Sequence, residues 1–364
     1  MAVAKTLIHI LSANRWGGVE RYALDICRHY ISCGWNVAAV TRDAKAVDTF
    51  FEKEGVSLLH APFGSMLDLQ SARMLAKILK KCDPDSVTIH AHGFRNAFTA
   101  LLARKIAGRK DVRIISTRHK VKKGIDTWLF RRIYRNLDAI ICVSRIAADR
   151  FLSTWHNKEL PFPRERLVVI HNSLNVNLPS SPERKEKGPL SAMFHGPLIP
   201  GKGIETLIDA MSMLKGSRLR LKIVGSGTPD YVDRLRRRAL TRGVMDMIDW
   251  YKMSPDPMGL IAECDFGVLP SHTEEAFGLS NIEYMACGRP QVCSSNGAQP
   301  EYLTDGWEGF LTTPGNAAQL ADAMRKLASD ASLRQRMGER AFKTFNEKLS
   351  WQKFISRIDP LYNP

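Results

Sequence analysis

The sequence lacks several features that would assign a protein to a class at once. No apolar run reaches the ~18 residues that a membrane-spanning helix needs. The first ten residues are short and strand-like, so we do not expect a secretory signal. The seven cysteines form no Cys-x-x-Cys pair. We therefore expect reduced thiols in a cytosolic protein rather than a disulfide framework or a zinc site.

Nucleotide and metal motifs are scarce as well. The segment Gly225-Ser226-Gly227 lacks the third glycine of a dinucleotide fingerprint, which argues against a nicotinamide enzyme. The one Asp-x-Asp segment, at 83–85, precedes an apolar run and is typical of a turn that ends a helix. We expect no metal site and no cofactor. The sequence also contains no low-complexity tract.

What the sequence has in excess is positive charge, with a formal net charge of +16. Residues 1–180 carry 29 Lys and Arg against 15 Asp and Glu, whereas residues 181–364 carry 24 against 22. Residues 101–150 alone carry 14 against 4. This asymmetry predicts a basic face in the first half, which would attract acidic lipid, nucleic acid or a phosphorylated acceptor. Its central residues are Arg113, Arg118, Lys120, Lys122, Lys123, Arg131, Arg132 and Arg135.

Short apolar runs alternate with amphipathic stretches in both halves, which is typical of parallel sheets covered by helices on both faces. Strands are expected at 7–11, 37–41, 87–92, 114–117, 139–143, 167–170, 190–195, 220–224, 248–250 and 266–269, and a further strand starts at 290–293. The segment 178–189 contains three prolines and no apolar periodicity, and it predicts a linker. We therefore expect an α/β protein with one domain at 1–177 and a second at 190–349.

The most informative stretch is Glu275-Ala-Phe-Gly-Leu-Ser-Asn-Ile-Glu283. Its two carboxylates stand where an expected strand passes into a helix. In an open α/β sheet this is the crevice in which ligands bind, and a helix N-terminus there offers N–H groups to an anion. Two other interpretations stay open on spacing alone. Ser280 and Glu283 have the spacing of a capping box, and Glu275 could be a solvated loop residue.

This stretch resembles the E-x7-E signature of the retaining family 4 glycosyltransferases, which have the GT-B fold. Further segments resemble that family in the same order along the chain, over roughly residues 7–330, with Ser173 where the family has glycine. These segments are Gly17–Arg21, Ile89–His92, Ser116–His119, Val143-Ser144, Val169–Ser173, His195–Gly203, Ile223–Gly227 and Gly297–Glu301.

The resemblance implies two Rossmann-like domains that face each other across a cleft. The first would bind the acceptor and the second the nucleotide sugar, with a tail at 350–364 that packs back on the first domain. It further implies retaining transfer from a nucleotide sugar, which we expect to be a UDP-sugar, to a lipid-linked or anionic glycan. Lipopolysaccharide or another cell-surface glycan is the expected product. The expected location is cytoplasmic, on the inner face of the plasma membrane.

The resemblance also assigns roles to single residues. His119, Glu275 and Lys202 are the expected catalytic residues, and His92 is a second candidate histidine. Lys202 would stabilise the charge that develops on the diphosphate, Glu275 would hold sugar hydroxyls and Glu283 would bind the ribose. The expected donor site comprises Gly17, Gly18, Gly196, Lys202, Gly227, Phe277, Gly278, Leu279 and Glu283. The expected acceptor or membrane contacts are Arg118, Lys120, Lys122 and Lys123.

Pro197 departs from the family pattern, because an arginine that helps to clamp the diphosphate usually stands there. Proline offers no donor to a phosphate. Arg15, Arg21 and Arg118 of the first domain are the candidates to replace that charge.

Two other functions remain open on the sequence alone. A sugar-nucleotide epimerase on the same fold would release an altered sugar nucleotide without an acceptor. A basic nucleic-acid-binding protein would interleave exposed aromatic and basic residues. Trp128, Phe130 and Tyr134 do occur within the basic run, but we expect them on an apolar helix face with Ile125 and Ile133, in the core.

Overall fold

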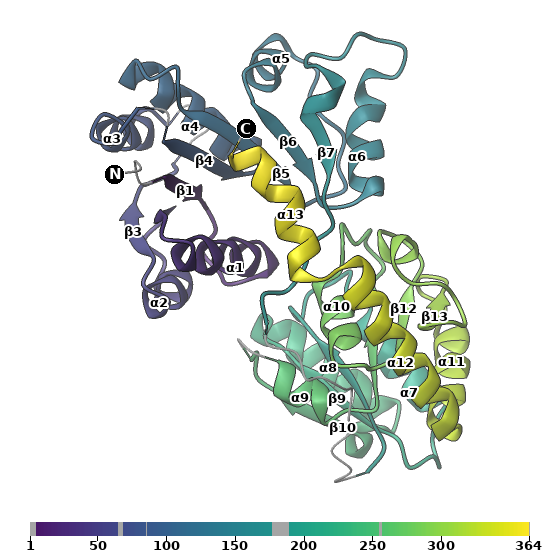
Figure 1. The fold of residues 1–364 in the computed structure, drawn as a ribbon. Coiled ribbons are helices and arrows are strands. Elements are labelled where there is room, and N and C mark those ends of the chain that lie inside the picture. Colours follow the sequence, from purple (N-terminus) through teal and green to yellow (C-terminus); the bar gives the residue numbers. More distant parts are fainter. Residues whose placement is uncertain (1–4, 65–67, 85, 177–188, 255–256, 364) are drawn as a thin grey trace. The chain divides into compact units, whose positions relative to one another are not determined.

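The computed structural model describes residues 5–64, 68–84, 86–176, 189–254 and 257–363. Contacts divide the chain into two compact units (Figure 1). Unit 1 comprises Met1–Asn175 together with Trp351–Pro364, and unit 2 comprises Val176–Ser350. The linker expected at 178–189 lies, apart from Pro189, outside the described residues.

Unit 1 contains a seven-stranded parallel sheet with the order β3-β2-β1-β4-β5-β6-β7. The strands are β1 (Thr6–Ile10), β2 (Asn36–Thr41), β3 (Ser57–His60), β4 (Val87–His92), β5 (Arg113–Arg118), β6 (Ala139–Cys142) and β7 (Leu167–Val169). The helices are α1 (Gly18–Ser32), α2 (Lys45–Lys53), α3 (Leu69–Leu79), α4 (Phe94–Ala107), α5 (Trp128–Arg135), α6 (Arg145–Leu152) and α13 (Trp351–Tyr362).

Successive residues of the strands enter two different cores, because side chains alternate across a sheet. Ile8 and Ile114 pack with α3 to α6 in one cluster, whereas Leu7 and Ile115 pack with α1 and α2 in the other. Both faces of the sheet are therefore covered, which explains why its central strands are largely apolar.

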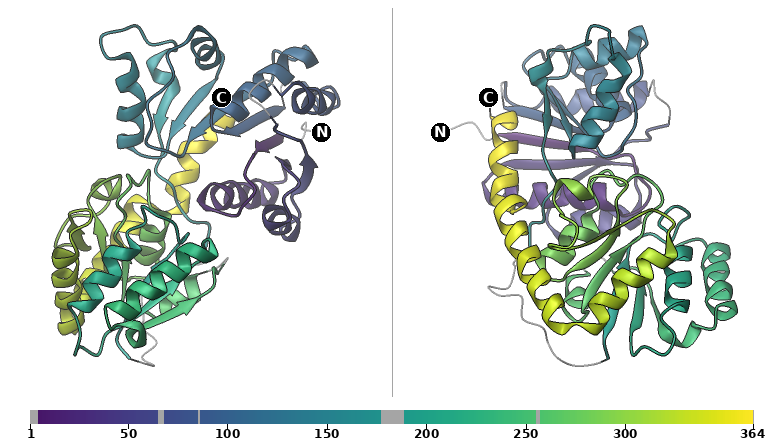
Figure 2. Two further views of the ribbon diagram at one scale, coloured as in Figure 1. Left: turned by 180° about the vertical axis from the view of Figure 1, so that it is seen from behind. Right: turned by 90° about the vertical axis from the view of Figure 1, so that its right-hand side faces the viewer.

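The C-terminal helix α13 belongs to unit 1 and supplies apolar residues to the α1 and α2 side of the sheet. Phe354, Ile355, Ile358 and Tyr362 are buried in that cluster. Figure 2 shows this yellow helix beside the strands of unit 1. The aromatic character of the tail thus has a packing cause, since its rings complete a core that α1 and α2 leave open.

Unit 2 contains a six-stranded parallel sheet with the order β10-β9-β8-β11-β12-β13. The strands are β8 (Ser191–His195), β9 (Arg220–Val224), β10 (Ile248–Tyr251), β11 (Phe266–Leu269), β12 (Gln291–Ser294) and β13 (Gly309–Thr312). The helices are α7 (Ile204–Ser212), α8 (Pro229–Thr241), α9 (Met258–Ala262), α10 (Leu279–Ala286), α11 (Ala317–Ser329) and α12 (Ala331–Lys348).

Two elements at sheet edges were not expected from the sequence. The edge strand β3 contains only two apolar residues, and all four of its residues are exposed or half-buried. The other edge strand, β13, likewise has only four residues. An edge strand pairs on one side only, so it needs less apolar sequence than a central strand and is harder to detect.

Candidate active site

Both sheets have a point at which the strand order reverses, and the predicted site residues gather at these points. In unit 1 the reversal lies between β1 and β4, and in unit 2 between β8 and β11. Loops leave neighbouring strands in opposite directions there, which opens a crevice at the carboxyl ends of the strands.

In unit 2 the loop that follows β8 is rich in glycine for steric reasons. Gly203 precedes α7 with a φ of 71°, and a Cβ on it would lie 1.8 Å from the carbonyl oxygen of Pro270. Only glycine fits such a contact, so this loop lies directly against the loop that follows β11. The arrangement places Lys202 next to the first turn of α7.

Lys202 and Glu275 meet at this contact between the two loops. Nζ of Lys202 lies 2.6 Å from Oε1 of Glu275, and the hydroxyl of Ser271 donates to the same carboxylate at 2.5 Å. The backbone of Glu275 is fixed as well, because its carbonyl oxygen accepts from the N–H of Ala298 at 3.0 Å. Glu275 is therefore an oriented acceptor rather than a solvated loop residue.

Glu283 is paired with His195 and does not cap its helix. Helix α10 begins after Gly278, which has a φ of 86° and makes no side-chain cap. Oε2 of Glu283 lies 2.9 Å from Nε2 of His195, the last residue of β8, and both residues are buried. Ser280, the other residue of the suspected capping box, donates to the carbonyl oxygen of His195 at 3.1 Å. The capping interpretation is therefore wrong.

The remaining predicted donor residues of unit 2 are held by packing. Gly227 is needed because a Cβ there would lie 2.2 Å from the carbonyl oxygen of Leu198. Phe277 is buried, and its carbonyl oxygen accepts from the hydroxyl of Tyr302 at 2.6 Å. Gly196, with a φ of 146°, directly follows His195, and Leu279 begins α10. These residues shape the two loops around Lys202, Glu275 and Glu283.

Pro197 is exposed, and the three arginines considered as its replacement differ sharply. Arg21 pairs with Asp25 at 3.1 Å, one helical turn along α1. Arg118 is buried. Arg15 is exposed and makes no hydrogen bond or ion pair with another described residue. Of the three, Arg15 alone is therefore not engaged in a contact within unit 1, and its replacement of the missing charge stays a prediction.

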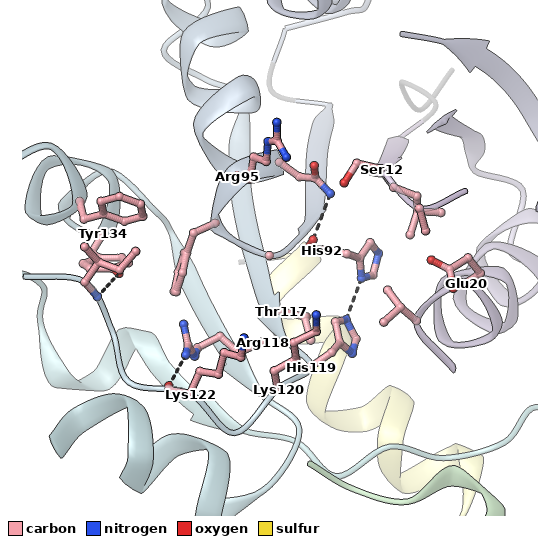
Figure 3. A pocket seen from close by; sticks show the side chains of 18 of the residues that line it. Ser12, Glu20, His92, Arg95, Thr117, Arg118, His119, Lys120, Lys122 and Tyr134 are labelled. Carbon is pink, nitrogen blue, oxygen red and sulfur yellow. Dashed lines mark hydrogen bonds between the residues drawn. The ribbon is translucent and has the colours of Figure 1, made fainter. Parts of the chain in front are cut away.

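Unit 1 contains a cavity of about 500 Å³ at its own reversal point (Figure 3). The lining comes from Leu11 to Ala13 after β1, from His92 at the end of β4 and the residues up to Asn96, and from the segment around the end of β5 between Thr117 and Lys123. The apolar part of the lining includes Phe94, Ile125, Phe130 and Tyr134. The polar part includes Glu20, Arg95, His119, Lys120, Lys122 and Lys123.

Glu20, which the sequence analysis assigned no role, is buried in this cavity wall with 4% of its surface exposed. Burial raises the pKa of its carboxyl, and backbone N–H groups of Glu20 and Gly17 act in the opposite direction. A Cβ on Gly17 would lie 3.3 Å from Oε2 of Glu20. Gly17 and the exposed Gly18 thus open α1 and leave room for this carboxylate, which gives them a structural role in addition to the predicted donor contact.

Four histidines lie side by side beneath the cavity. The strand register aligns His9 with His90, and His92 with Thr117, so the rings of β1, β4 and the residue after β5 come together. Nδ1 of His9 lies 2.9 Å from Nε2 of His92, and Nδ1 of His92 lies 3.0 Å from Nε2 of His119. His92 and His119 both line the cavity.

Three of these rings come close enough to suggest a metal site, which the sequence did not. Ring nitrogens of His9, His90 and His92 lie within 4.8 Å of one another. However, the rings of His9 and His92 are within 14° of parallel, and both nitrogens of His90 contact hydroxyls, those of Tyr362 and Thr117. Nitrogens that share a tetrahedral zinc ion at about 2.0–2.1 Å are roughly 3.3 Å apart, with lone pairs that converge. The rings are therefore arranged for hydrogen bonds to their neighbours rather than for a metal.

Arg118 lines the cavity, and its guanidinium is also held by contacts within unit 1, so its expected contact with acceptor or membrane stays a prediction. Its guanidinium lies over the rings of Phe94 and Phe151, at 4.8 and 4.1 Å from their centroids, and donates to the carbonyl oxygen of Lys122. Arg118 therefore holds the loop that follows β5, while Lys120, Lys122 and Lys123 on that loop are exposed.

The aromatic residues of the basic segment are not all in the core. Ile133 and Tyr134 are buried as expected, but Trp128 is 73% exposed and Ile125 is 47% exposed. The expectation for these two residues was wrong because α5 begins only at Trp128, so that its first turn extends beyond the core. Ile125 is held in place by its N–H group, which donates to the hydroxyl of Tyr134 at 3.1 Å.

Sequence reasoning gave no site role to His9, His195 or Ser271. His9 stands within an apolar strand, where a histidine signals a buried polar contact. His195 precedes a glycine at the end of a strand, and this pattern could have indicated a site residue. Ser271 carries no signal, since its contact with Glu275 depends on the turn between them.

Comparisons with known proteins agree with this architecture. The family model "Glycosyltransferase Family 4" matches residues 16–178, and "Glycosyl transferases group 1" matches residues 180–344. An uncharacterised glycosyltransferase of Methanocaldococcus jannaschii is 25% identical over 85% of this chain and 76% of its own length. The O-antigen chain mannosyltransferase C of Escherichia coli is 26% identical over 82% and 81%.

Among solved structures, Anabaena HepE in complex with UDP and glucose superposes with a TM-score of 0.82. It is 21% identical, and the match covers 98% of both chains. The two family models together span almost the whole chain, one on each sheet. The chain therefore belongs to the family 4 glycosyltransferases and has their GT-B fold of two Rossmann-like domains.

Proposed function

We propose that this chain is a retaining glycosyltransferase that moves a hexose from a UDP-sugar to a lipid-linked or anionic glycan. The observation that carries the proposal is the pairing of Lys202 with Glu275, and of His195 with Glu283, where the strand order of unit 2 reverses. A lysine beside glycine-rich backbone suits a diphosphate, and a buried carboxylate suits ribose hydroxyls. The UDP in the similar Anabaena structure favours uracil as the base.

The contacts of Glu275 support a role in holding the sugar rather than attacking it. Its carboxylate already accepts from Lys202 and Ser271, which orients it as an acceptor for sugar hydroxyls. In the proposed step the acceptor oxygen bonds to the anomeric carbon on the face from which the diphosphate departs. The acceptor proton passes to the departing phosphate oxygen. Lys202 stabilises the charge on that leaving group, and no metal or other cofactor takes part.

The cavity of unit 1 and the surface beside it support an amphiphilic, anionic acceptor at a membrane. The lining of the cavity combines apolar residues with Lys120, Lys122 and Lys123. Trp128 and Ile125 project from the same segment, which combines positive charge with interfacial apolar groups. No helix within the described ranges is both long and apolar enough to cross a bilayer. The similarity to an O-antigen chain mannosyltransferase favours a role in lipopolysaccharide assembly, which we propose takes place on the cytosolic face of the membrane.

A titration of the purified protein with UDP-, GDP-, dTDP- and ADP-sugars tests the donor, and product analysis tests the reaction. We expect tightest binding of a UDP-sugar and, with an acceptor extract, a product that keeps the donor's anomeric configuration. An inverted product would contradict the retaining mechanism. Release of an altered sugar nucleotide in the absence of any acceptor would instead identify an epimerase.

A further inference from the structure

The histidine row of unit 1 comprises His9, His92 and His119. Its hydrogen bonds can be donated in either of two directions along the row, and the surroundings of His9 determine which direction is stable. The rings are joined edge to edge by two hydrogen bonds, of 2.9 and 3.0 Å. One end of the row, His119, lines the cavity, and Figure 3 shows its ring hydrogen-bonded to that of His92. The other end, His9, is fully buried in the sheet.

All three rings are neutral at physiological pH. Burial lowers the pKa of His9 and of His119 to about 3, and it places the pKa of His92 well below its ordinary value. The neighbouring His90 and Lys120 act in the same direction, because a positive charge on any of these groups disfavours another. Each ring therefore carries one N–H group and one lone pair.

Neutral rings in a row must all donate in the same direction. If Nδ1–H of His9 donates to His92, then Nδ1–H of His92 donates to His119, and His119 carries its proton on Nδ1. If the direction is reversed, Nε2–H of His119 donates to His92, Nε2–H of His92 donates to His9, and His119 is left with a lone pair on Nδ1. The two arrangements thus give His119 opposite hydrogen-bonding characters.

The buried end of the row distinguishes between them. Nε2 of His9 is buried and has no hydrogen-bond partner among the described residues. The first direction leaves a lone pair at that atom, and the second leaves an N–H group. A buried N–H group without a partner is the rarer and more costly of the two. The first direction is therefore the stable one.

We propose that the absence of a hydrogen-bond partner at Nε2 of His9 fixes the tautomer of His119, so that His119 offers an Nδ1–H donor to the cavity. His9 acts through His92 as a positioning residue and does not touch the substrate. His119 consequently recognises an oxygen with a free lone pair, such as a hydroxyl, carboxylate or phosphate oxygen. It is not the base that deprotonates the acceptor, which agrees with proton transfer to the diphosphate if the proposed function holds.

The same geometry excludes a proton wire through these residues. A proton wire needs a hydrogen-bond partner at each end, and Nε2 of His9 has none among the described residues. The tautomers of the row therefore stay as they are during turnover.

The test is nuclear magnetic resonance of the protein labelled with ¹⁵N-histidine, at mildly alkaline pH and without substrate. The two tautomers differ in which ring nitrogen has the shift of a protonated nitrogen. We expect His9, His92 and His119 to be Nδ1–H tautomers, assigned from the signals lost in single variants. An Nε2–H tautomer at His119 in the unaltered protein would overturn the proposal.

Two variants of His9 sharpen the test. His9→Asp places a carboxylate oxygen near the former Nδ1, where it accepts from Nε2–H of His92 and should reverse the row, giving His119 an Nε2–H tautomer. His9→Leu, of similar size, leaves Nε2 of His92 without a hydrogen-bond partner and should keep Nδ1–H at His119. Reversal in both variants, or in neither, would contradict the proposal.

A kinetic readout connects the tautomer to the reaction. We expect His9→Asp to lower kcat/KM about tenfold or more, and more than His9→Leu does, because a donor to the substrate has become an acceptor. Equal losses in two folded variants would mean that the tautomer has no role in catalysis. The tautomer measurement needs no turnover, so it can fail or succeed independently of the proposed activity.

Discussion

Nζ of Lys202 lies 2.6 Å from Oε1 of Glu275, although 73 residues separate them in the chain. The contact exists because the loops after β8 and β11 touch at Gly203, where any larger residue would collide with Pro270. It means that the lysine proposed to hold the diphosphate and the carboxylate proposed to hold the sugar orient each other before any donor binds. Such pre-orientation lowers the cost of ordering the site on binding.

Lys202→Ala should lower turnover by about 10²–10³ without unfolding unit 2, because the leaving group loses its charged donor. Steady-state kinetics with the best donor, together with thermal unfolding, checks this. Lys252→Ala, which removes an exposed lysine of the same unit, is the control. Unchanged turnover in a folded Lys202 variant would mean that the diphosphate binds elsewhere. Pro197→Arg, which restores the usual family residue, should be neutral or slightly activating.

Glu283→Gln should weaken binding of UDP by about 1.5–3 kcal/mol, since ribose hydroxyls lose a charged acceptor. Glu275→Gln should mainly lower turnover. Isothermal titration calorimetry with UDP separates the two effects, and Glu263→Gln, at a 58% exposed side chain, provides the control. If the Glu283 variant binds UDP as tightly as the unaltered protein, the ribose assignment is wrong.

Activity should not depend on a divalent metal, because Lys202 and the first turn of α7 are proposed to supply the positive potential that a metal would provide elsewhere. Turnover measured with and without EDTA tests this directly. Loss of activity in EDTA that magnesium or manganese restores would count against the mechanism.

The protein should bind vesicles that contain anionic lipid, and binding should weaken as salt rises. Each basic residue near an anionic surface contributes about 1 kcal/mol, so replacing Lys120, Lys122 and Lys123 by Glu should lower the partition coefficient about 100-fold or more. Co-sedimentation measures this, thermal unfolding is the control for folding, and UDP affinity should be unchanged.

Trp128→Ala should weaken the same binding severalfold, because an interfacial indole is lost. Trp307→Ala is a matched control, as Trp307 is 51% exposed and lies in unit 2. Equal recovery with neutral and anionic vesicles, or binding to nucleic acid in preference to either, would remove the membrane proposal.

Unit 1 should lose stability as pH falls below about 6.5, because His9 and His90 are fully buried. Burial lowers the pKa of His9 to about 3 and that of His90 well below its ordinary value. Between these values and about 6.5 the unfolded chain binds protons that the native state does not. Each of these histidines therefore lowers the unfolding free energy by up to about 1.4 kcal/mol per pH unit.

Hydrogen exchange of amides in β1 and β4, at several pH values above 5, reports this loss for unit 1 alone. The range lies above the ordinary pKa values of carboxyl groups, at about 4. His9→Leu should reduce the slope by about one proton. A slope that the variant leaves unchanged would show that His9 is protonated in the native state.

The sequence predicted the order of most strands and helices, and its motifs indicated the family. Alternation of apolar runs and amphipathic stretches follows from a sheet covered on both faces, and the glycine and glutamate motifs keep their order along the chain. Residues at the ends of central strands, such as His119 and Glu275, could therefore be placed at the edge where ligands bind. Edge strands such as β3 were missed, because one-sided pairing requires little apolar sequence.

Only the tertiary structure decided which side chains meet. The partner of Glu283 is His195 on a neighbouring strand, although its spacing from Ser280 predicted a local cap. Arg118 is enclosed by two phenylalanine rings, whereas Trp128, expected in the core, is exposed because α5 begins there. The histidine row depends on the register between β1, β4 and β5. A strand pattern fixes which face a residue lies on, but contacts across strands depend on register, and register is set by the packing of the whole sheet.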